Sequence, residues 1–576
     1  MAAMVHVWTR PDMPRRSHAS FFPVILPALA AAALLACAAS GLGDDNQRPP
    51  RRALQRAAPS WNNDWSRGAV FYEAFVRSFQ DSNGDGIGDL KGLIAKLDYL
   101  NDGNPDSTTD LGVDALWLMP VFVSPSYHGY DTTDYEHINP EYGTDDDFTT
   151  LCSEAHRRGI RVIVDFVINH SGSGHPWFVD ASSGPTAAKR NWYVWSPVDL
   201  GWRQPWNLYG GADTWHQNPA DGQWFYGVFW AGMPDLNIRN PEVRAEIKRL
   251  ATLWLSRGVD GFRLDAARHL IENGGGLLQV DQPETHAFWR ELSAHVRSVK
   301  PEATLVGEAW TDTPIIATYY GSTAPVPGGD ELPMTFDFPL AAAIIQGVNT
   351  GDASVISGKL AEVQSVYPRG ANDAPFLTNH DMVRLATQLG HDPAKLRNAA
   401  AILLTVPGTP FLYYGEEVGL ENGSSDTDDR LKRTPMPWDA SSPGGGFTSG
   451  TPWFSFAPGR ETANVAVQSA DPASLLSRYR ALIRARHASA ALQRGDLRLA
   501  TAGGGGHVLA FFRAAGEEQV LVVHNVSDAI QTAGPYATTA TAAETVLADS
   551  GASVSVGTGS CSVTLLPRTT GIWRLR

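Results

Sequence analysis

Three carboxylate side chains each stand at the end of a short apolar run of the sequence. Asp265 lies in GFRLDAARH, Glu308 in LVGEAW and Asp381 in FLTNHD. A fourth run, VIVDFVINH, also ends in polar residues, the last of which is His170. Runs of Val, Ile, Leu and Phe with polar residues only at the carboxyl end are typical of buried parallel strands, and barrels of such strands place their chemistry at that end. The four segments therefore predict one pocket lined by several acids.

The pattern that must position these acids begins at Trp61, where strand-like and helix-like stretches start to alternate, as in parallel βαβ units. Helical stretches occur at 241–258 and 284–300, and Thr144 with Asp147 predicts a capping box before VIVDFV. Eight candidate strands follow one another: VFYEAF, ALWLMP, RVIVDFV, GFRLDA, TLVGEA, MTFDF, APFLTNH and PFLYYGEE. Eight such strands predict an α/β fold, a closed (β/α)8 TIM barrel.

Two parts of the chain depart from this alternation. Residues 171–232, after the third strand, hold eight Trp, many Gly and little periodicity; a connection this long in a compact domain is usually a functional insertion. Residues 492–576 change to short strands with Gly- and Thr-rich turns, which predicts a C-terminal antiparallel β-domain. The barrel would then consist of residues 61–170 and 233–491.

The N-terminus is typical of an exported protein. In residues 1–36, several Arg precede the apolar run FFPVILPALAAAALLA. This run is shorter than a typical membrane-spanning helix, so it predicts a cleaved signal peptide. Cys37 follows Leu-Leu-Ala, a sequence that resembles a bacterial lipobox; the alternative is a Cys near an ordinary cleavage site. The polar, Pro-rich residues 37–60 predict a flexible linker. We expect a lipoprotein anchored on the periplasmic or cell-surface side, and otherwise a secreted protein.

Charge and cysteine content narrow the class of protein. The 61 acidic and 46 basic residues give a net charge of −15. This negative charge argues against nucleic acid as a partner. It also argues against binding to an anionic membrane surface, so that contact with a membrane is expected only through the lipid anchor. An excess of acidic residues is compatible with an uncharged substrate. Cys152 and Cys561 fall in parts of the chain expected to form different domains, so both are predicted to be small buried hydrophobic residues, without a disulfide.

The four acid-bearing segments, in this order and spacing, resemble the signature regions of the alpha-amylase family, glycoside hydrolase family 13. A fifth segment, Met233-Pro234-Asp235-Leu236-Asn237, is similar to a short family motif near the end of its inserted domain B. A single NHD or GEAW would be a weak signal, but five ordered segments are not plausibly accidental. The resemblance covers about residues 65–490 and implies that 171–232 is domain B.

The resemblance assigns a role to each acid. Asp265 is implied to be the nucleophile, Glu308 the general acid and base, and Asp381 a third acid that binds sugar hydroxyls and stabilises the transition state. Two carboxyl groups near 5 Å apart would make the enzyme retaining, through a covalent glycosyl intermediate. Because Arg263 precedes Asp265 by two residues on one strand, its side chain points to the same side and can keep that aspartate ionised. Glu308 can then hold its proton near neutral pH.

Five further residues match positions that bind sugar in the family. His170 and His380, each directly after an Asn, would donate hydrogen bonds to hydroxyl groups, and Tyr130 in HGYDTTDY would stack on the same sugar. Arg268 and His269 would hold the next sugar, although Arg268 replaces the commoner Lys, and its planar guanidinium differs in geometry. The alternative for each His is a structural residue, and for the Tyr a core residue.

The segment DSNGDGIGDLKG after the first strand resembles the metal loop of oligo-1,6-glucosidase relatives. Asp81, Asn83, Asp85 and Asp89 place oxygen atoms at intervals along it, with the Ile87 carbonyl as a further ligand. The loop is not an EF-hand, because position twelve is Gly and no helix precedes it. Calcium is the expected cofactor; magnesium and a metal-free polar turn are the alternatives.

The expected activity is endo-acting hydrolysis of α-1,4 bonds in starch and maltooligosaccharides, which together form the α-glucan substrate class, with transglycosylation as a further outcome. Relatives that prefer α-1,6 bonds carry Val after the nucleophile, whereas this chain has Ala266, which leaves room for an α-1,4-linked chain. The first alternative is an exo-acting relative: an α-glucosidase, an oligo-1,6-glucosidase or a trehalose synthase. The second is a non-catalytic barrel used for interaction, which predicts lost acids and a membrane span; the chain retains its acids.

Overall fold

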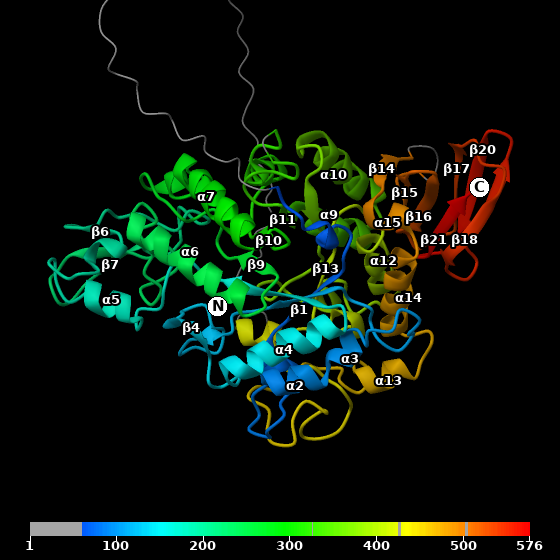
Figure 1. Cartoon of the computed structure of the whole chain (residues 1–576). Helices are drawn as coiled ribbons and strands as arrows, with labels where there is room; N and C mark the ends of the chain where they lie inside the picture. The colour runs from blue at the N-terminus through cyan, green and yellow to red at the C-terminus, as the bar shows by residue number, and fades with distance from the viewer. Residues whose placement is uncertain (1–59, 325, 424–427, 501–504) are drawn as a thin grey trace, which may run out of the picture. The chain divides into compact units, whose positions relative to one another are not determined.

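The barrel predicted from the sequence is present in the structure, a computed structural model that describes residues 60–324, 326–423, 428–500 and 505–576. Its strands are β1 (Phe71–Ala74), β2 (Ala115–Leu118), β5 (Arg161–Phe166), β9 (Gly261–Leu264), β10 (Thr304–Gly307), β11 (Met334–Phe336), β12 (Asn372–Ala374) and β13 (Phe411–Tyr413). They form one parallel sheet in the order β12-β11-β10-β9-β5-β2-β1-β13. A parallel bridge from Phe376 to Phe411 closes this sheet on itself, so the (β/α)8 fold is confirmed (Figure 1).

The predicted signal peptide, Cys37 and the predicted linker up to residue 59 lie outside the described residues. One predicted strand is displaced: β12 ends at Ala374, whereas the sequence predicted a strand at 374–380. Pro375 lacks the N–H that a continuing ladder needs, so the strand stops there and only the isolated bridge of Phe376 follows. The apolar residues beyond it were mistaken for the strand itself.

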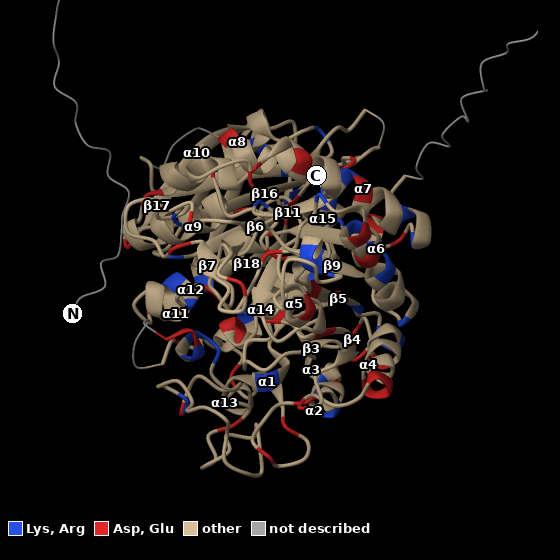
Figure 2. Ribbon diagram, turned by 90° about the vertical axis from the view of Figure 1, so that its left-hand side faces the viewer, with Lys and Arg blue, Asp and Glu red and all other residues tan. Residues whose placement is uncertain are grey.

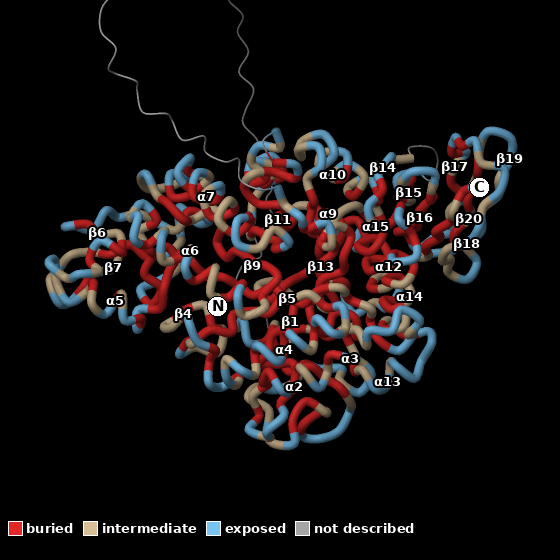
Figure 3. The backbone as a smooth tube through the Cα atoms, in the orientation of Figure 1, coloured by how far each residue is buried: buried red, intermediate tan, exposed pale blue. Residues whose placement is uncertain are grey.

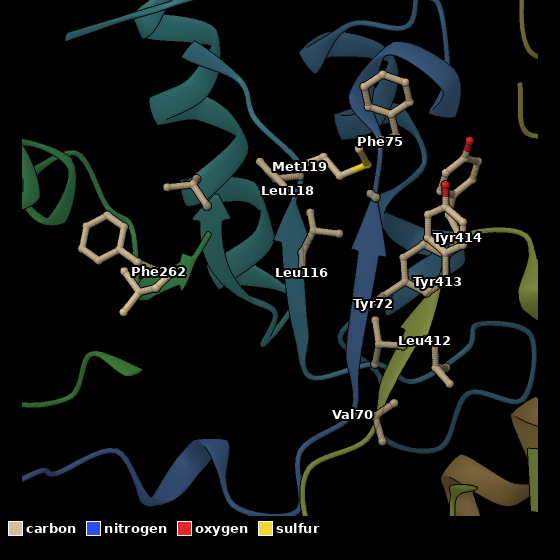
Figure 4. Close-up of a cluster of buried hydrophobic side chains, with 14 of the residues drawn as sticks. Val70, Tyr72, Phe75, Leu116, Leu118, Met119, Phe262, Leu412, Tyr413 and Tyr414 are labelled. Carbon is tan, nitrogen blue, oxygen red and sulfur yellow. The ribbon is translucent and has the colours of Figure 1, made fainter. Parts of the chain in front are cut away.

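The barrel strands separate two hydrophobic layers. Phe71 and Trp117 belong to a cluster with members from seven of the eight strands, which fills the barrel interior. Their neighbours Tyr72 and Leu116 belong to a larger cluster that includes the surrounding helices. Figure 4 shows Tyr72, Leu116 and Leu412 in this second cluster, on β1, β2 and β13. Because successive side chains alternate across a strand, one strand supplies both layers, and the strands are almost wholly buried (Figure 3).

Most of the helices follow the strands around the barrel, and one of them, residues 176–181, lies in the inserted segment instead. They are α1 (Val76–Phe79), α2 (Leu90–Ala95), α3 (Leu97–Leu100), α4 (Asp145–Arg157), α5 (Pro176–Ala181), α6 (Pro241–Ser256), α7 (Pro283–Val299), α8 (Thr313–Ile316), α9 (Phe338–Thr350), α10 (Ala353–Val366), α11 (Leu385–Gln388), α12 (Pro393–Leu403), α13 (Val465–Ser469), α14 (Leu475–His487) and α15 (Ala490–Arg494). The capping box of Thr144 and Asp147 is confirmed at the start of α4. Acidic and basic residues mix on α4 and α6 (Figure 2). No helix in the described ranges is long and apolar enough to cross a membrane.

The segment after β5 leaves the barrel and forms its own small sheet. A separate ribbon, β3 (Phe122–Val123) with β4 (Asp134–Ile138), precedes it. The strands β6 (Trp195–Ser196), β8 (Trp224–Tyr226) and β7 (Trp215–Gln217) lie in that order, around a core of Trp215, Tyr226 and Val228. A bridge between His170 and Asp235 ties the two ends of this segment together at the mouth of the barrel.

The C-terminal residues form two antiparallel sheets. The first has the order β14 (Asp496–Leu499), β15 (Val508–Ala515), β16 (Glu518–Asn525), β21 (Thr570–Leu575) and β18 (Ala543–Ala548), and the second β17 (Gln531–Ala537), β20 (Ser560–Leu565) and β19 (Ser553–Gly557). The predicted C-terminal antiparallel β-domain is therefore confirmed. Cys152 and Cys561 are buried and unpaired, also as predicted.

Candidate active site

One buried guanidinium joins three carboxylates at the carboxyl ends of β5, β9 and β10. Nη1 of Arg263 lies 2.6 Å from Oδ1 of Asp265 and 2.8 Å from Oδ1 of Asp165, and Nη2 lies 2.9 Å from Oε2 of Glu308. The Arg263 side chain is 1% exposed. The structure therefore brings Asp265 and Glu308 together on one cation; the strand spacing of residues 263 and 265 predicted the contact with Asp265 and not the one with Glu308.

Glu308 is the carboxyl group of this site that holds a proton most readily near neutral pH. Burial is the largest cause: it raises the pKa of Glu308 to about 7, against the opposing charge of Arg263 and with help from the negative charge of Asp265. Oε2 of Glu308 also accepts a hydrogen bond of 2.9 Å from the N–H of Ala266. Burial likewise raises the pKa of Asp165, to about 6. A protonated carboxyl thus stands beside Asp265.

Asp381 has a different environment, dominated by cations. Its Oδ2 lies 3.1 Å from Nε2 of His380, and its Oδ1 lies 2.8 Å from Nη2 of Arg433. Burial opposes ionisation, but the charges of His380 and Arg433 together hold the pKa of Asp381 well below its usual range. Arg433 was not predicted from the sequence, because it lies about fifty residues beyond the motif, in a loop without a recognisable pattern. Asp381 is therefore an ionised acid beside a protonated one.

Tyr130 and His380 form a hydrogen-bonded pair next to these acids. The Tyr130 hydroxyl lies 2.6 Å from Nε2 of His380 and donates to Oδ2 of Asp165 at 3.1 Å, and the two rings stack with centroids 5.5 Å apart. His170 is held by the Tyr130 carbonyl, 3.1 Å from its Nε2, and by Oδ1 of Asn169, 3.0 Å from its Nδ1. Burial lowers the pKa of His170. The three predicted side chains therefore gather on one side of Asp381.

Two cavities meet at the acids and share Phe229, Glu308 and Asp381. The smaller, of about 280 Å³, is also lined by His128, Tyr130, His170, Trp230, Met233, Asp265, Asp429 and Arg433. The larger, of about 560 Å³, is also lined by Pro205, Trp206, Ala266, Arg268, His269, Leu277, Val280 and Trp310. A chain of sugars that crossed from one cavity to the other would pass between the acids.

Arg268 and His269 line the larger cavity, but not as free donors. The guanidinium of Arg268 makes two hydrogen bonds to Asp281, of 2.9 and 2.6 Å, and a third to the Trp310 carbonyl. Nδ1 of His269 is buried and has no hydrogen-bond partner among the described residues, and burial lowers the pKa of this imidazole to about 3. Trp206, half exposed on the cavity wall, was not predicted from the sequence, although the many Trp of the insertion were a signal for it.

The loop after the first strand is built of successive turns. Asp81, Asn83 and Asp85 each accept a hydrogen bond from the N–H two residues further on. Asp89 caps α2 through the N–H of Gly92. No three His, Cys, Asp or Glu side chains among the described residues are grouped as a metal site would need. The oxygen-only donor set that includes Asn83 and the Ile87 carbonyl is nevertheless the kind calcium prefers.

Comparison with known proteins places this site in a family. Residues 73–495 match the family description "Alpha amylase, catalytic domain". The chain is 38% identical over 483 residues to "Alpha-amylase 3" of Dictyoglomus thermophilum, with 81% of this chain and 86% of that protein covered. It is 35% identical over 524 residues to "Trehalose synthase/amylase TreS" of Mycolicibacterium smegmatis, with 82% and 86% covered. The crystal structure of an alpha-amylase from H. orenii matches with a TM-score of 0.78 at 38% identity, covering 88% of this chain and 99% of that chain.

Proposed function

The chain belongs to the alpha-amylase family of glycoside hydrolases, and from that premise we propose that it is a retaining, endo-acting hydrolase of α-1,4-glucosidic bonds in starch and maltooligosaccharides. One observation carries the proposal: Asp265 and Glu308 are bound to neighbouring nitrogens of one guanidinium, where two cavities meet. Carboxyl groups held this closely suit the spacing of about 5 Å found in retaining enzymes.

The proposed reaction has two steps. In the first, a carboxylate oxygen of Asp265 bonds to the anomeric carbon while the glycosidic C–O bond breaks, and Glu308 gives its proton to the departing oxygen. In the second, Glu308 takes a proton from water, whose oxygen displaces Asp265. A sugar hydroxyl in place of water would give transglycosylation. Arg263 keeps Asp265 ionised before it attacks and stabilises the carboxylate again when water displaces it, and Asp381 holds sugar hydroxyls and the positive charge that develops at the anomeric carbon.

One observation favours the exo-acting alternative, in which the enzyme is an α-glucosidase or a trehalose synthase. The cavity that contains Tyr130, His170 and Asp265 is the smaller, about 280 Å³ against about 560 Å³, and Arg433 and Asp429 lie on its wall. In this alternative the smaller cavity holds the non-reducing end of the substrate, and its size limits how many sugars bind beyond the cleaved bond. The two alternatives therefore differ in which products they release.

Product analysis separates these activities. Soluble starch, maltotriose and maltose are incubated separately with the enzyme, and the products are followed over time by chromatography, with the anomeric configuration of the first products read by NMR. We expect starch to give a range of short maltooligosaccharides in the α configuration, with maltose cleaved slowly. Release of glucose alone, or formation of trehalose from maltose, would contradict endo action. A first product in the β configuration would contradict retention.

We also propose that the loop of Asp81, Asn83, Asp85, Ile87 and Asp89 holds calcium. The three successive turns and the all-oxygen donor set support this. A cation that binds only the folded loop stabilises it by mass action, so a chelator should lower the melting temperature of the wild type.

The test of this metal site compares two aspartates that each accept one backbone hydrogen bond in an exposed turn. Asp85→Ala should abolish the response of the melting temperature to chelator, whereas Asp199→Ala, in a turn of the insertion, should leave it unchanged. Elemental analysis should find calcium in the wild type and less in Asp85→Ala. A melting temperature that does not change when chelator is added, with no metal in the purified protein, would exclude the site.

A further inference from the structure

Glu73 is a buried carboxylate that no step of the proposed reaction uses. It lies on β1 and is 2% exposed. Because it follows Phe71 by two residues, it shares the face of the strand that points into the barrel interior. Its Oε1 is 2.6 Å from Nδ1 of His380, a residue 307 positions away and fully buried. A carboxylate is expensive to bury unless it is paired, so this contact calls for a physical explanation.

The imidazole of His380 meets a carboxylate at each of its two nitrogens. Nδ1 faces Glu73, and Nε2 faces Asp381 at 3.1 Å as well as the Tyr130 hydroxyl at 2.6 Å. A neutral imidazole has only one N–H, so it can donate to one of these carboxylates but not to both. Only the imidazolium form donates at both nitrogens. The geometry therefore favours a charged His380.

Two buried arginines lie near His380, but neither donates to its ring nitrogens among the described residues. Arg433 donates to the His380 carbonyl, and Arg263 on β9 contacts the three carboxylates described above. The Trp117 ring lies edge-on from β2, with the two ring centroids 5.7 Å apart. Asp165 on β5 contributes a third negative charge, which interacts with His380.

We propose that Glu73 is a positioning residue for the glycosidase reaction: it keeps His380 doubly protonated and correctly oriented, so that His380 acts as a fixed cation toward Asp381 and as a donor toward bound substrate. The proposal rests on the proposed function of the site. In support, Asp381 and Glu73 raise the pKa of His380 to about 9, although burial, the largest single cause, acts to lower it. His380, one of the cations that hold Asp381 ionised, is thus itself held by a residue 307 positions earlier in the sequence.

The charge of His380, and with it the activity, should depend on pH. A pKa raised in this way means that His380 carries its charge below about pH 9 and loses it above. Without the negative charge of Glu73, the pKa of His380 should fall, and the imidazole should become neutral within the working range of the enzyme. Activity on the alkaline side would then be lost at a lower pH than in the wild type.

Glu73→Gln tests charge separately from position, because the amide oxygen of Gln can still accept the hydrogen bond from Nδ1 of His380. In the wild type, kcat/KM on maltotriose should fall in two steps, near pH 7 where Glu308 loses its proton and near pH 9 where His380 loses its own. We expect Glu73→Gln to move the second step, the His380 limb, down by about one pH unit or more, with a smaller loss at pH 5.5 than at pH 8. Glu73→Asp, which keeps the charge, should restore part of the alkaline activity. The imidazole titration of His380, followed by NMR, should shift in the same direction as the limb.

Glu417→Gln provides the matched control. Glu417 is also a fully buried glutamate beside β13, but it accepts hydrogen bonds from Tyr72 and Tyr99 outside the barrel interior. Its substitution should lower the melting temperature without moving the pH profile. A Glu73→Gln variant whose activity fell equally at all pH values, with an unchanged His380 titration, would show a merely structural role and overturn the proposal. The titration needs no substrate, so it tests Glu73 even if the wild type cleaved no glucan.

Discussion

At the scale of single residues, the site depends on one cation shared among several acids. Arg263 cannot lose its proton, and it contacts Asp165, Asp265 and Glu308 at once. One positive charge cannot compensate three negative charges in a buried site, so at least one carboxyl must hold a proton. Two of these carboxyl groups have a raised pKa, and that of Glu308, about 7, is higher than that of Asp165, about 6. The division into ionised and protonated acids therefore follows from burial and charge number.

The first prediction concerns these two roles. Asp265→Ala should abolish turnover, because no covalent intermediate can form, and Glu308→Gln should lower the rate by about 10² or more. Glu308 acts as an acid, so kcat/KM of the wild type should fall as pH rises through about 7, where it loses its proton. Measured pH profiles on maltotriose should show this limb in the wild type and not in Glu308→Gln. Either variant with more than about a hundredth of the wild-type rate would refute the assignment.

The second prediction concerns the residue after the nucleophile. Ala266 lines the larger cavity beside Glu308, and its φ is 48°, in the left-handed region. Ala266→Val should favour α-1,6 over α-1,4 bonds by about 1–2 kcal/mol, because the stiff side chain fills space beside the cleaved bond. The structure adds a cost that the sequence did not reveal: a β-branched residue is strained at this φ, so the melting temperature should also fall.

Ala266→Gly is the control for this strain. It relieves the backbone without filling the cavity, so the ratio of isomaltose to maltotriose cleavage should stay near that of the wild type. The ratio is measured as relative kcat/KM on the two sugars. A wild type that cut isomaltose faster than maltotriose would contradict the α-1,4 preference and favour the oligo-1,6-glucosidase alternative.

At the scale of elements, periodicity predicted the strands better than the loops between them. Seven of the eight barrel strands lie within their predicted segments, because an apolar run bounded by turn residues has few alternatives. The strand before Asp381 was misplaced, since one Pro decides where its ladder ends. Contacts that depend on loops, such as Arg433 with Asp381 or Glu73 with His380, carry no local pattern and were not predicted. Only closure of the barrel brings these residues together.

The third prediction concerns two buried acids, Asp373 on β12 and Asp337, which follows β11 and caps α9. Asp373 sits beside Thr335 in the register of the two strands, and Asp337 follows on the same face. Oδ2 of Asp337 and Oδ1 of Asp373 are buried without any other hydrogen-bond partner among the described residues. Burial raises the pKa of Asp337 to about 6, and burial and the charge of Asp337 raise that of Asp373. One proton shared between the two oxygens would satisfy both.

A raised pKa stabilises the fold at low pH, and that contribution is lost as pH rises through the folded-state value. The melting temperature of the wild type should therefore fall between pH 5 and pH 8. Asp373→Asn supplies an N–H donor that does not titrate, so its melting temperature should fall less over this range. Asp64→Asn, at an exposed position, should behave like the wild type. Equal slopes for wild type and Asp373→Asn would contradict the shared proton.

At the scale of the whole molecule, a buried arginine joins the C-terminal β-domain to the barrel. Arg513 on β15 donates to the Thr405 carbonyl at 2.6 Å. Within the barrel part of the chain, Arg486 on α14 donates to the neighbouring Leu404 carbonyl at 3.1 Å. These carbonyls lie in the loop that leads into β13. The sequence predicted both parts but not this contact, because an isolated Arg in a helix or strand pattern is usually solvent-exposed. The interface is fixed by tertiary packing and has no motif of its own.

The last prediction concerns where the molecule resides. Cys37 follows an apolar run preceded by Arg10, Arg15 and Arg16, and we propose that it is the lipidated N-terminus of the mature protein. Stable anchoring needs more than one acyl chain, and a lipidated N-terminal Cys supplies this. The wild type should partition into the detergent phase and incorporate labelled fatty acid, whereas Cys37→Ser should do neither. Cys152→Ser, at a buried position within the catalytic part of the chain, should still be labelled. Wild-type protein found only in the culture supernatant, with an N-terminus other than Cys37, would show secretion without an anchor.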